Sequence, residues 1–204
     1  MAHLGQQITN TRTGQRMTFV ELQRDSLRID SVNPPTDERE PLHVHPKQES
    51  GAELVSGSLV FEVNGVQRIL APGDSISIPP NTPHRFWNDG HEDAHSIGFF
   101  RPALAIAEFF ETLFALANAG KLDAKGMPRP LQLAVMVPRF GDEIRTVRPP
   151  WPVLRAVAMV LKPLARARGY RSTILAPSSN SPAGCRVSSA RSPATSRSSP
   201  SLRG

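Results

Sequence analysis

A succession of short β-type segments runs from Met17 to Phe100 and restricts what this chain can fold into. Several segments alternate apolar and polar residues, as half-buried strands do, and Asn64-Gly65 between two of them is a strong hairpin signal. No helical pattern interrupts the series, which argues against a parallel α/β sheet. About eight or nine short strands at this spacing predict a mainly β sandwich, jelly roll or small barrel. The expected strands are 17–22, 26–32, 42–45, 52–57, 58–63, 66–70, 75–78, 84–88 and 94–100.

Helical patterns begin only after Pro102. Apolar residues recur at helical spacing from 104 to 117, and Gly120 follows where a helix stop belongs. Two more helices are expected over about 130–137 and 152–168, the second of them kinked or shortened by Pro163. We therefore divide the chain into three parts. These are a β-barrel over 1–100, a helical extension over 101–171 that packs on the barrel or forms a dimer interface, and a tail over 172–204.

Charge is distributed unevenly along the chain. Residues 1–143 hold 13 Lys and Arg against 18 Asp and Glu, whereas residues 144–204 hold 11 basic residues and no acidic one. Such an asymmetry can indicate a nucleic-acid or anionic membrane partner. The charges are dispersed, however, the tail has no stacking aromatic residue, and no nucleic-acid-binding motif is present. We therefore predict a solvated basic surface, a disordered tail over 172–204 and no nucleic-acid partner.

The N-terminus and the cysteine content bear on the compartment. The first residues lack the basic start and apolar run of a signal peptide. No apolar stretch approaches the roughly 18 residues that span a bilayer. The single cysteine, Cys185, excludes an internal disulfide framework and a Cys-rich zinc module. These features predict a cytoplasmic protein without a membrane span.

Histidines are concentrated in the β region, where two of them form a His-Val-His sequence at 43–45. Residues i and i+2 of a strand project to the same face, so His43 and His45 point in the same direction. Further along, Gly73 and a run of prolines set turns that lead to His84 at the start of another strand. A barrel interior can bring these three imidazoles together around one ion.

These residues resemble the two motifs of the cupin superfamily. The first is HVHPKQES followed by LVSG, and the second is GDSISIPPNTPHRFWN, which matches at Gly73, Pro79, His84 and Asn88. Asn81 stands where the family has glycine, and asparagine also tolerates a left-handed conformation. The resemblance covers residues 35–100 closely. It implies a double-stranded β-helix, a jelly-roll barrel that holds one divalent transition metal ion (Zn, Ni, Cu, Fe or Mn), and a homodimer.

The resemblance implies His43, His45 and His84 as the imidazole ligands, and it leaves the carboxylate ligand open. The family places a glutamate seven positions before the motif glycine, and seven positions before Gly57 is Ser50. Glu49 is adjacent, but a one-residue offset sends its side chain to the opposite face. A β-bulge near Gly51 would turn Glu49 inward as a fourth metal ligand and catalytic base. Otherwise Ser50 or water completes the site.

Another string, HEDAH at 91–95, matches the H-E-x-x-H pattern of zinc metalloproteases. That chemistry needs a helix to bring both histidines to one face. Here the string follows a turn at 88–90 and runs into a β-type segment. We interpret His91 and His95 as loop or rim residues.

The functional prediction is a barrel that binds a divalent metal ion and a small organic ligand. Oxygenase, isomerase and decarboxylase activities all occur among proteins that this chain resembles, and nothing in the sequence selects among them. A metal-dependent enzyme, a non-catalytic ligand-binding barrel with a degenerate metal site and a metal-free dimerisation scaffold are therefore the alternatives.

Overall fold

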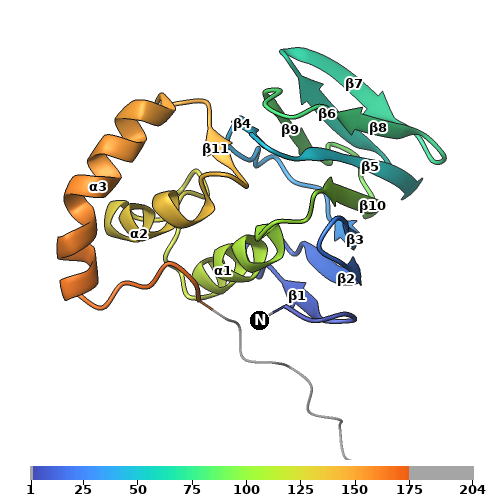
Figure 1. Ribbon diagram of the computed structural model, residues 1–204. Coiled ribbons are helices and arrows are strands. Elements are labelled where there is room, and N and C mark those ends of the chain that lie inside the picture. The colour runs from blue at the N-terminus through green and yellow to red at the C-terminus, as the bar shows by residue number, and fades with distance from the viewer. Residues whose placement is uncertain (1, 175–204) are drawn as a thin grey trace, which may run out of the picture.

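Two antiparallel β-sheets face each other in the computed structural model, which describes residues 2–174 (Figure 1). The six-stranded sheet has the order β1-β2-β3-β10-β5-β8, and the five-stranded sheet has the order β11-β4-β9-β6-β7. The strands of the first sheet are β1 (Gln7–Thr9), β2 (Arg16–Leu22), β3 (Leu27–Asn33), β5 (Glu49–Ser56), β8 (Ser75–Ile78) and β10 (Ala94–Arg101). Those of the second are β4 (His43–Val44), β6 (Leu59–Val63), β7 (Val66–Leu70), β9 (His84–Trp87) and β11 (Arg145–Thr146).

The alternation in the sequence decides which side chains fill the space between the sheets. In β3, every second residue from Leu27 to Asn33 is buried. The two sheets contribute one cluster around Leu54, Leu59 and Phe61, in which Phe61 stacks on Phe86 at a centroid distance of 5.4 Å. This arrangement confirms the predicted mainly β double-stranded β-helix. The structure adds two short strands that the sequence pattern did not predict, β1 and β11.

Helix α1 (Ile106–Asn118) covers the part of the six-stranded sheet formed by β1, β2 and β3. Phe19 and Ile29 of the sheet are buried in one cluster with Ile106 and Phe114 of the helix. The apolar face of α1 therefore covers this half of the six-stranded sheet, and the five-stranded sheet covers the other half. Burial of this kind contributes most of the stability of an amphipathic helix.

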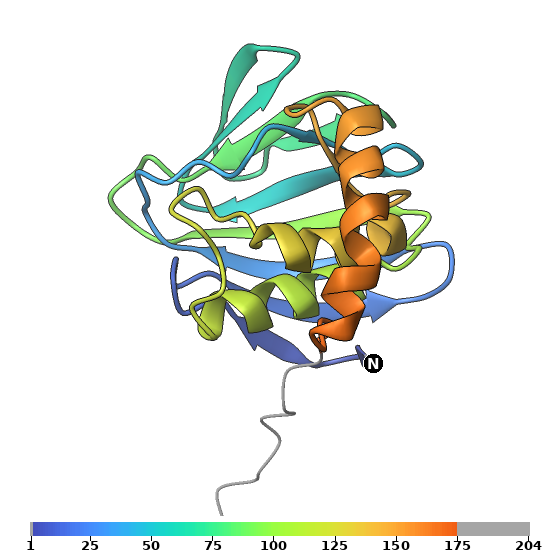
Figure 2. The same ribbon diagram turned by 90° about the vertical axis from the view of Figure 1, so that its left-hand side faces the viewer.

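Helices α2 (Pro130–Phe140) and α3 (Trp151–Ala167) form further layers outward from α1 (Figure 2). Leu116 of α1 packs on Met136 and Phe140 of α2. On its other side, α2 packs through Ala134 and Val135 against Ala165 of α3. Proline occupies an early position in both helices, where its missing N–H has no intrahelical partner. Helix α3 continues past Pro163, so this proline does not end it.

The proposed division into a barrel over 1–100, an extension over 101–171 and a tail over 172–204 stays a prediction. The described strands β1 to β10 precede all three helices, as that division assumes. From residue 175 onward, the predicted disordered tail lies outside the described residues.

Candidate metal centre

The three histidines of the two sequence motifs meet between the sheets. His43 on β4 is the direct register partner of His84 on β9, and His45 follows β4 by one residue. The ring centroids are 4.5 Å apart for His43 and His84, 5.1 Å for His43 and His45, and 5.2 Å for His45 and His84. One ring nitrogen of each lies within 4.8 Å of the others. The cluster is buried, with exposed fractions of 8, 4 and 5 % for His43, His45 and His84.

Each imidazole is oriented by a backbone carbonyl. The Nδ1 atoms of His43 and His84 lie 2.9 Å from the oxygen of Pro41 and 2.8 Å from that of Thr82. His45 Nδ1 lies 2.6 Å from the oxygen of Glu143. A carbonyl oxygen only accepts, so each Nδ1 carries the proton and each Nε2 keeps a free lone pair. This arrangement is the one that metal-binding histidines use, because it fixes the tautomer and the ring direction.

Burial keeps the three imidazoles neutral. It lowers the pKa of His43, and it lowers the pKa of His45 well below the ordinary value of 6.5, with the charge of His43 as a second cause. Burial and the charge of His43 lower the pKa of His84 to about 4. Neutral imidazole is the form that binds metal ions. The cluster is therefore ready to bind at neutral pH without a proton first having to leave.

The carbonyl that orients His45 comes from the helical extension. After α2, strand β11 returns to the five-stranded sheet and pairs with β4, with Arg145 opposite Val44. This pairing brings Glu143, two residues before Arg145, beside His45 even though 98 residues separate them in sequence. Glu143 could not be predicted from the sequence, because a two-residue strand leaves no recognisable pattern.

Glu49 does not join the histidine cluster. Strand β5 pairs without interruption from Glu49 to Gly51 with β10, and Ser50 and Gly51 also pair with β8, so the β-bulge considered for this segment is absent. Glu49 consequently lies on the outer side, where its carboxylate accepts a hydrogen bond from the exposed Ser77 hydroxyl. Its predicted roles as ligand and base have no support in this geometry.

Ser50 takes the inward position instead. It is 4 % exposed, and its hydroxyl has no hydrogen-bond partner among the described residues. Its register partner on β10 is Phe100, whose ring lies 5.1 Å from the ring of His45. The position that resembles the family glutamate therefore faces the interior near the histidines, with a neutral hydroxyl in place of a carboxylate.

Further unpartnered polar atoms are buried near the same end of the barrel. Gln48 donates from Nε2 to the carbonyls of Pro102 and Ala103, while its Oε1 has no partner among the described residues. The Oε1 atom of Glu143 accepts a hydrogen bond from the backbone N–H of Ala105, and its Oε2 has no hydrogen-bond partner among the described residues. Such groups are costly to leave unsatisfied, so they indicate a bound ligand or water.

The carboxyl group of a half-buried glutamate, Glu40, also lies near His84. Glu40 precedes β4 and accepts a hydrogen bond from the backbone N–H of Phe86 at 3.2 Å. Burial raises the pKa of Glu40 to about 7, although that hydrogen bond and the charge of His84 act in the opposite direction. Glu40 belongs to neither motif, so the sequence pattern did not predict a role for it.

The turn before His84 is fixed by Asn81, which has the left-handed φ of 61° expected at the family's glycine position. The backbone N–H of Asn81 donates to the carbonyl of His45 at 2.8 Å. This bond ties the loop before His84 to the segment that carries the other two histidines.

The HEDAH string is placed away from the cluster. Its first part lies in a bend and its last two residues begin β10, so no helix brings His91 and His95 to one face. His95 instead lies 2.9 Å from the carboxylate of Asp30. A metalloprotease site is therefore excluded for this string.

Residues 32–98 match the model of the family described as "Cupin domain". An oxidoreductase of Arthrobotrys oligospora is 31 % identical over 72 residues, which are 35 % of this chain and 28 % of that protein. The chain thus spans under a third of that relative's length.

Two solved structures are similar to about half of this chain. KdgF from Halomonas sp. is 22 % identical, over 47 % of this chain and 84 % of the other, with a TM-score of 0.43. An RmlC-like cupin from Shewanella frigidimarina is 20 % identical, over 50 % of this chain and 93 % of the other, also with a TM-score of 0.43.

Proposed function

We propose, from the premise that residues 32–98 form a cupin domain, that the barrel binds one divalent transition metal ion and a small organic ligand beside it. His43, His45 and His84 would hold the ion. The observation that carries the proposal is that all three Nδ1 atoms are engaged by backbone carbonyls, which leaves three neutral Nε2 atoms in one buried cluster.

The donor set favours particular metals. Three imidazoles without an adjacent carboxylate form a neutral site, which suits Zn²⁺, Ni²⁺ or Cu²⁺ better than the harder Mn²⁺. Three protein ligands also leave positions open for a ligand, as catalytic sites do and closed structural sites do not. When bound, the ion would supply Lewis-acid polarisation of a ligand oxygen.

The chain's own residues would bind the organic part of the ligand. Val63, Ile76 and Phe86 pack on the barrel core but are only partly buried, and Val63 is the register partner of His84. Val63 offers apolar contact next to His84, and Phe86 lies two residues further along the strand of His84. The hydroxyl of Ser50 and the free Oε2 of Glu143 would take up hydrogen bonds from polar groups of the ligand or from water.

An enzymatic role requires a group that moves protons, and Glu40 meets this requirement. Its pKa of about 7 lets the carboxyl group either donate or accept a proton near neutral pH. An oxygenase or isomerase would use such a group beside the metal. The Arthrobotrys oligospora relative is named an oxidoreductase, and an oxygenase would belong to that class.

Ser50 favours a second candidate, a non-catalytic ligand-binding barrel. A hydroxyl in place of the family carboxylate weakens the site for hard metals, as expected where catalysis has been lost and binding has been kept. A homodimer, implied by the resemblance, remains a prediction for both candidates.

Metal analysis tests the proposed function. The full chain, purified without added metal and then titrated with Zn²⁺ and Ni²⁺, should bind about one equivalent. His84→Ala should lower the affinity at least about a hundredfold, because the two remaining imidazoles cannot close the site. The matched control is His91→Ala, which removes an exposed histidine outside the cluster and should leave binding unchanged.

The proposed function fails if the wild-type chain binds neither metal, or if His84→Ala and His91→Ala bind equally well. Candidate diketone and phenolic substrates then separate the two candidates. Turnover that Glu40→Gln reduces, while metal binding persists, supports the enzyme. Binding of these compounds without turnover supports the ligand-binding barrel.

A further inference from the structure

Helix α3 has one side packed on α2 and an outer side that no other described element covers. Ala165 is buried against Ala134 and Val135 of α2. In Figures 1 and 2, α3 forms the outermost layer, and no other described element lies over its outer side. This uncovered side carries a row of apolar residues, which we call the α3 strip. The α3 strip comprises Val153, Val157, Val160 and Leu164, with exposed fractions of 55, 50, 78 and 44 %.

The exposure of large apolar side chains is concentrated on this helix. Among the described residues, eleven such side chains are exposed, and five of them belong to α3, namely the four of the strip and Met159. The other six are distributed over the N-terminal segment, β2, β5, β7 and the turn before α1. Single exposed apolar residues are normal, whereas a contiguous patch indicates an interaction site. The α3 strip is therefore the best candidate for such a site among residues 2–174.

The spacing of the α3 strip indicates what kind of surface covers it. Its successive members are four, three and four residues apart, which is the repeat of the inward positions in packed pairs of helices. At 100° per residue, the four side chains lie within an arc of about 60°. A helix that faces a broad apolar surface carries a wider stripe, and a seam this narrow is typical of contact with a second helix. We therefore expect a helix as the partner.

The charged residues of α3 point away from the α3 strip. At 100° per residue, Arg155, Lys162 and Arg166 project about 150 to 170° from the centre of the strip. The residues on the two flanks of the strip are uncharged, and they are Leu154, Ala156, Leu161, Pro163 and Ala167. An anionic partner on the strip would meet none of the three cations. The contact surface of the partner should therefore be uncharged as well as apolar.

We propose that the α3 strip joins two copies of this chain, with the two α3 helices packed antiparallel about a two-fold axis. A two-fold interface brings the same patch of both copies together, so the patch must be complementary to itself. The α3 strip meets this condition because it is helical, apolar and free of charge along both flanks. With the axis between Val157 and Val160, Val157 would contact Val160 of the partner subunit, and Val153 would contact Leu164 of the partner subunit.

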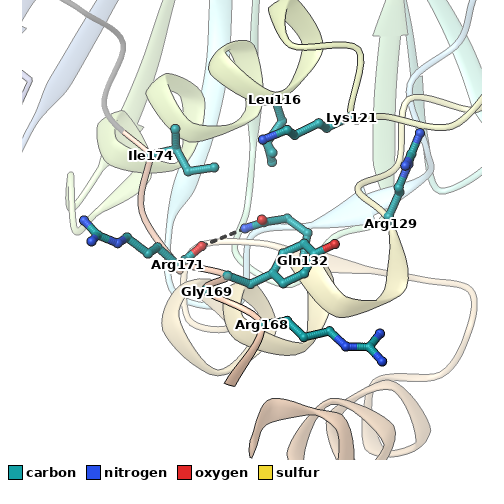
Figure 3. Close-up of a pocket in the computed structure, with 9 residues that line it drawn as sticks. Leu116, Lys121, Arg129, Gln132, Arg168, Gly169, Arg171 and Ile174 are labelled. Carbon is teal, nitrogen blue, oxygen red and sulfur yellow. Dashed lines mark hydrogen bonds between the residues drawn. The ribbon is translucent and has the colours of Figure 1, made fainter. Parts of the chain in front are cut away.

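The basic residues favour the antiparallel direction. Lys162, Arg166, Arg168 and Arg171 lie in or just after the C-terminal half of α3, and none of them has a carboxylate within 4.0 Å among residues 2–174. Figure 3 shows the side chains of Arg168 and Arg171 extending to opposite sides of the hollow that they line. In a parallel pair, these groups from both copies would meet at one end of the contact and repel each other. An antiparallel pair places them at opposite ends and also opposes the two helix dipoles.

Sedimentation equilibrium of the full chain tests the proposal. Four side chains per copy form a small interface, so we expect a dissociation constant on the order of 10 µM. Wild type should change from mainly dimer to mainly monomer as it is diluted from about 300 µM to about 1 µM. Val160→Asp should weaken the dimer at least about a hundredfold, at about tenfold for each of the two carboxylates that enter the apolar contact. Val157→Asp provides an independent variant with the same expected loss.

The matched control is Met159→Asp, which places the same charge on the next residue of the same helix. Met159 is 53 % exposed, and its side chain projects about 130° from the centre of the α3 strip. This variant should therefore dimerise like wild type. All three variants change exposed residues, and an unchanged thermal midpoint of the diluted protein verifies that each one folds.

Three outcomes overturn the proposal. The first is a wild-type chain that stays monomeric at every concentration, which leaves the α3 strip to a different partner or to another segment of the chain. The second is a dimer that Val160→Asp and Val157→Asp both retain, which assigns the contact to another surface such as the barrel. The third is an equal loss in Met159→Asp. Metal binding by the barrel enters none of these readouts, so the dimer proposal and the proposed function fail independently.

Discussion

The barrel and helix α3 differ in where they place the groups that lack a partner. Inside the barrel, the Nε2 atoms of three buried histidines and the hydroxyl of Ser50 face the space between the sheets. On α3, apolar side chains such as Val160 face outward, and the buried side is held by small residues such as Ala165. The barrel thus offers polar atoms in an enclosed place, and α3 offers apolar surface in an open one.

This difference indicates two kinds of partner. An enclosed cluster can take a metal ion and a small molecule, because the polar atoms are already desolvated and oriented by Pro41, Thr82 and Glu143. An open apolar strip needs a partner large enough to cover it. The extension connects the two regions, since β11 pairs with β4 at one end of it and α3 packs on α2 at the other.

Truncation of a core residue should give the largest effect and test the contrast directly. Phe19 has no exposed surface and packs where the sheet meets α1, so Phe19→Ala should lower the free energy of unfolding by about 3 to 5 kcal/mol. Val160→Ala on α3 should change that of the monomer by less than about 0.5 kcal/mol. Urea unfolding of dilute protein measures both, and a large loss for Val160→Ala would show that the outer side of α3 is covered within a single chain.

Acidification should destabilise the barrel through its histidines. The pKa of each clustered histidine is lowered in the folded state, so below about pH 6.5 the unfolded chain binds protons that the folded chain does not. The free energy of unfolding should therefore decrease on acidification, by about 1.4 kcal/mol per pH unit for a histidine that is protonated only in the unfolded chain. Urea unfolding in the presence of a chelator measures this slope, and His84→Ala should reduce it by about one histidine's share.

Glu40 changes the pH dependence of stability in the opposite direction from the histidines. Its pKa is raised to about 7 in the folded state, so its stabilising effect is complete below the ordinary value of 4.5 and is lost as the pH rises through 7. Glu40→Gln should accordingly steepen the acid loss and make the protein more stable than wild type above about pH 8. An unchanged pH profile in this variant would mean that the carboxyl group is solvated.

Exchange of residues on β5 tests which side of the strand faces the proposed metal site. Ser50→Glu places a carboxylate at the inward position and should raise the affinity for Zn²⁺ on the order of tenfold, about 1.4 kcal/mol, while it destabilises the metal-free protein. Glu49→Gln should leave the affinity unchanged, because Glu49 lies on the outer side with Ser77. Isothermal titration measures both, and weaker binding by Glu49→Gln would restore Glu49 as a ligand.

The loop before His84 should give the smallest effect. Asn81 has a φ of 61°, a conformation that costs a residue such as alanine about 1 kcal/mol. Asn81→Ala should therefore lower stability by about that amount, and Asn81→Gly should be close to neutral. Equal losses in the two variants would show that the asparagine side chain matters more than the backbone conformation.

Much of the barrel could be predicted from the sequence because the patterns that indicate it involve residues close to one another along the chain. Alternation marks strands such as β3, Asn64-Gly65 marks the hairpin between β6 and β7, and the spacing of His43 and His45 places both imidazoles on one face. Tolerance of a left-handed conformation at Asn81 also follows from the residue type.

The remaining features depend on contacts between distant segments. Whether Glu49 or Ser50 faces inward depended on a bulge, and only the pairing of β5 with β10 and β8 shows that there is none. Glu143 reaches His45 through a strand of two residues, too short to leave a pattern. The raised pKa of Glu40 arises from burial, which the sequence around it does not reveal.

By itself, the sequence determined the β-barrel, the three histidines and the basic character of residues 144–204, because residue type and spacing along the chain are sufficient for each. The tertiary structure decided which nitrogen of each imidazole is free, which residue of β5 faces the histidine cluster and which side of α3 is uncovered. The physical reason is that orientation and burial depend on neighbours brought together by folding, and the apolar residues of α3 look the same in sequence whether they pack on α2 or face outward.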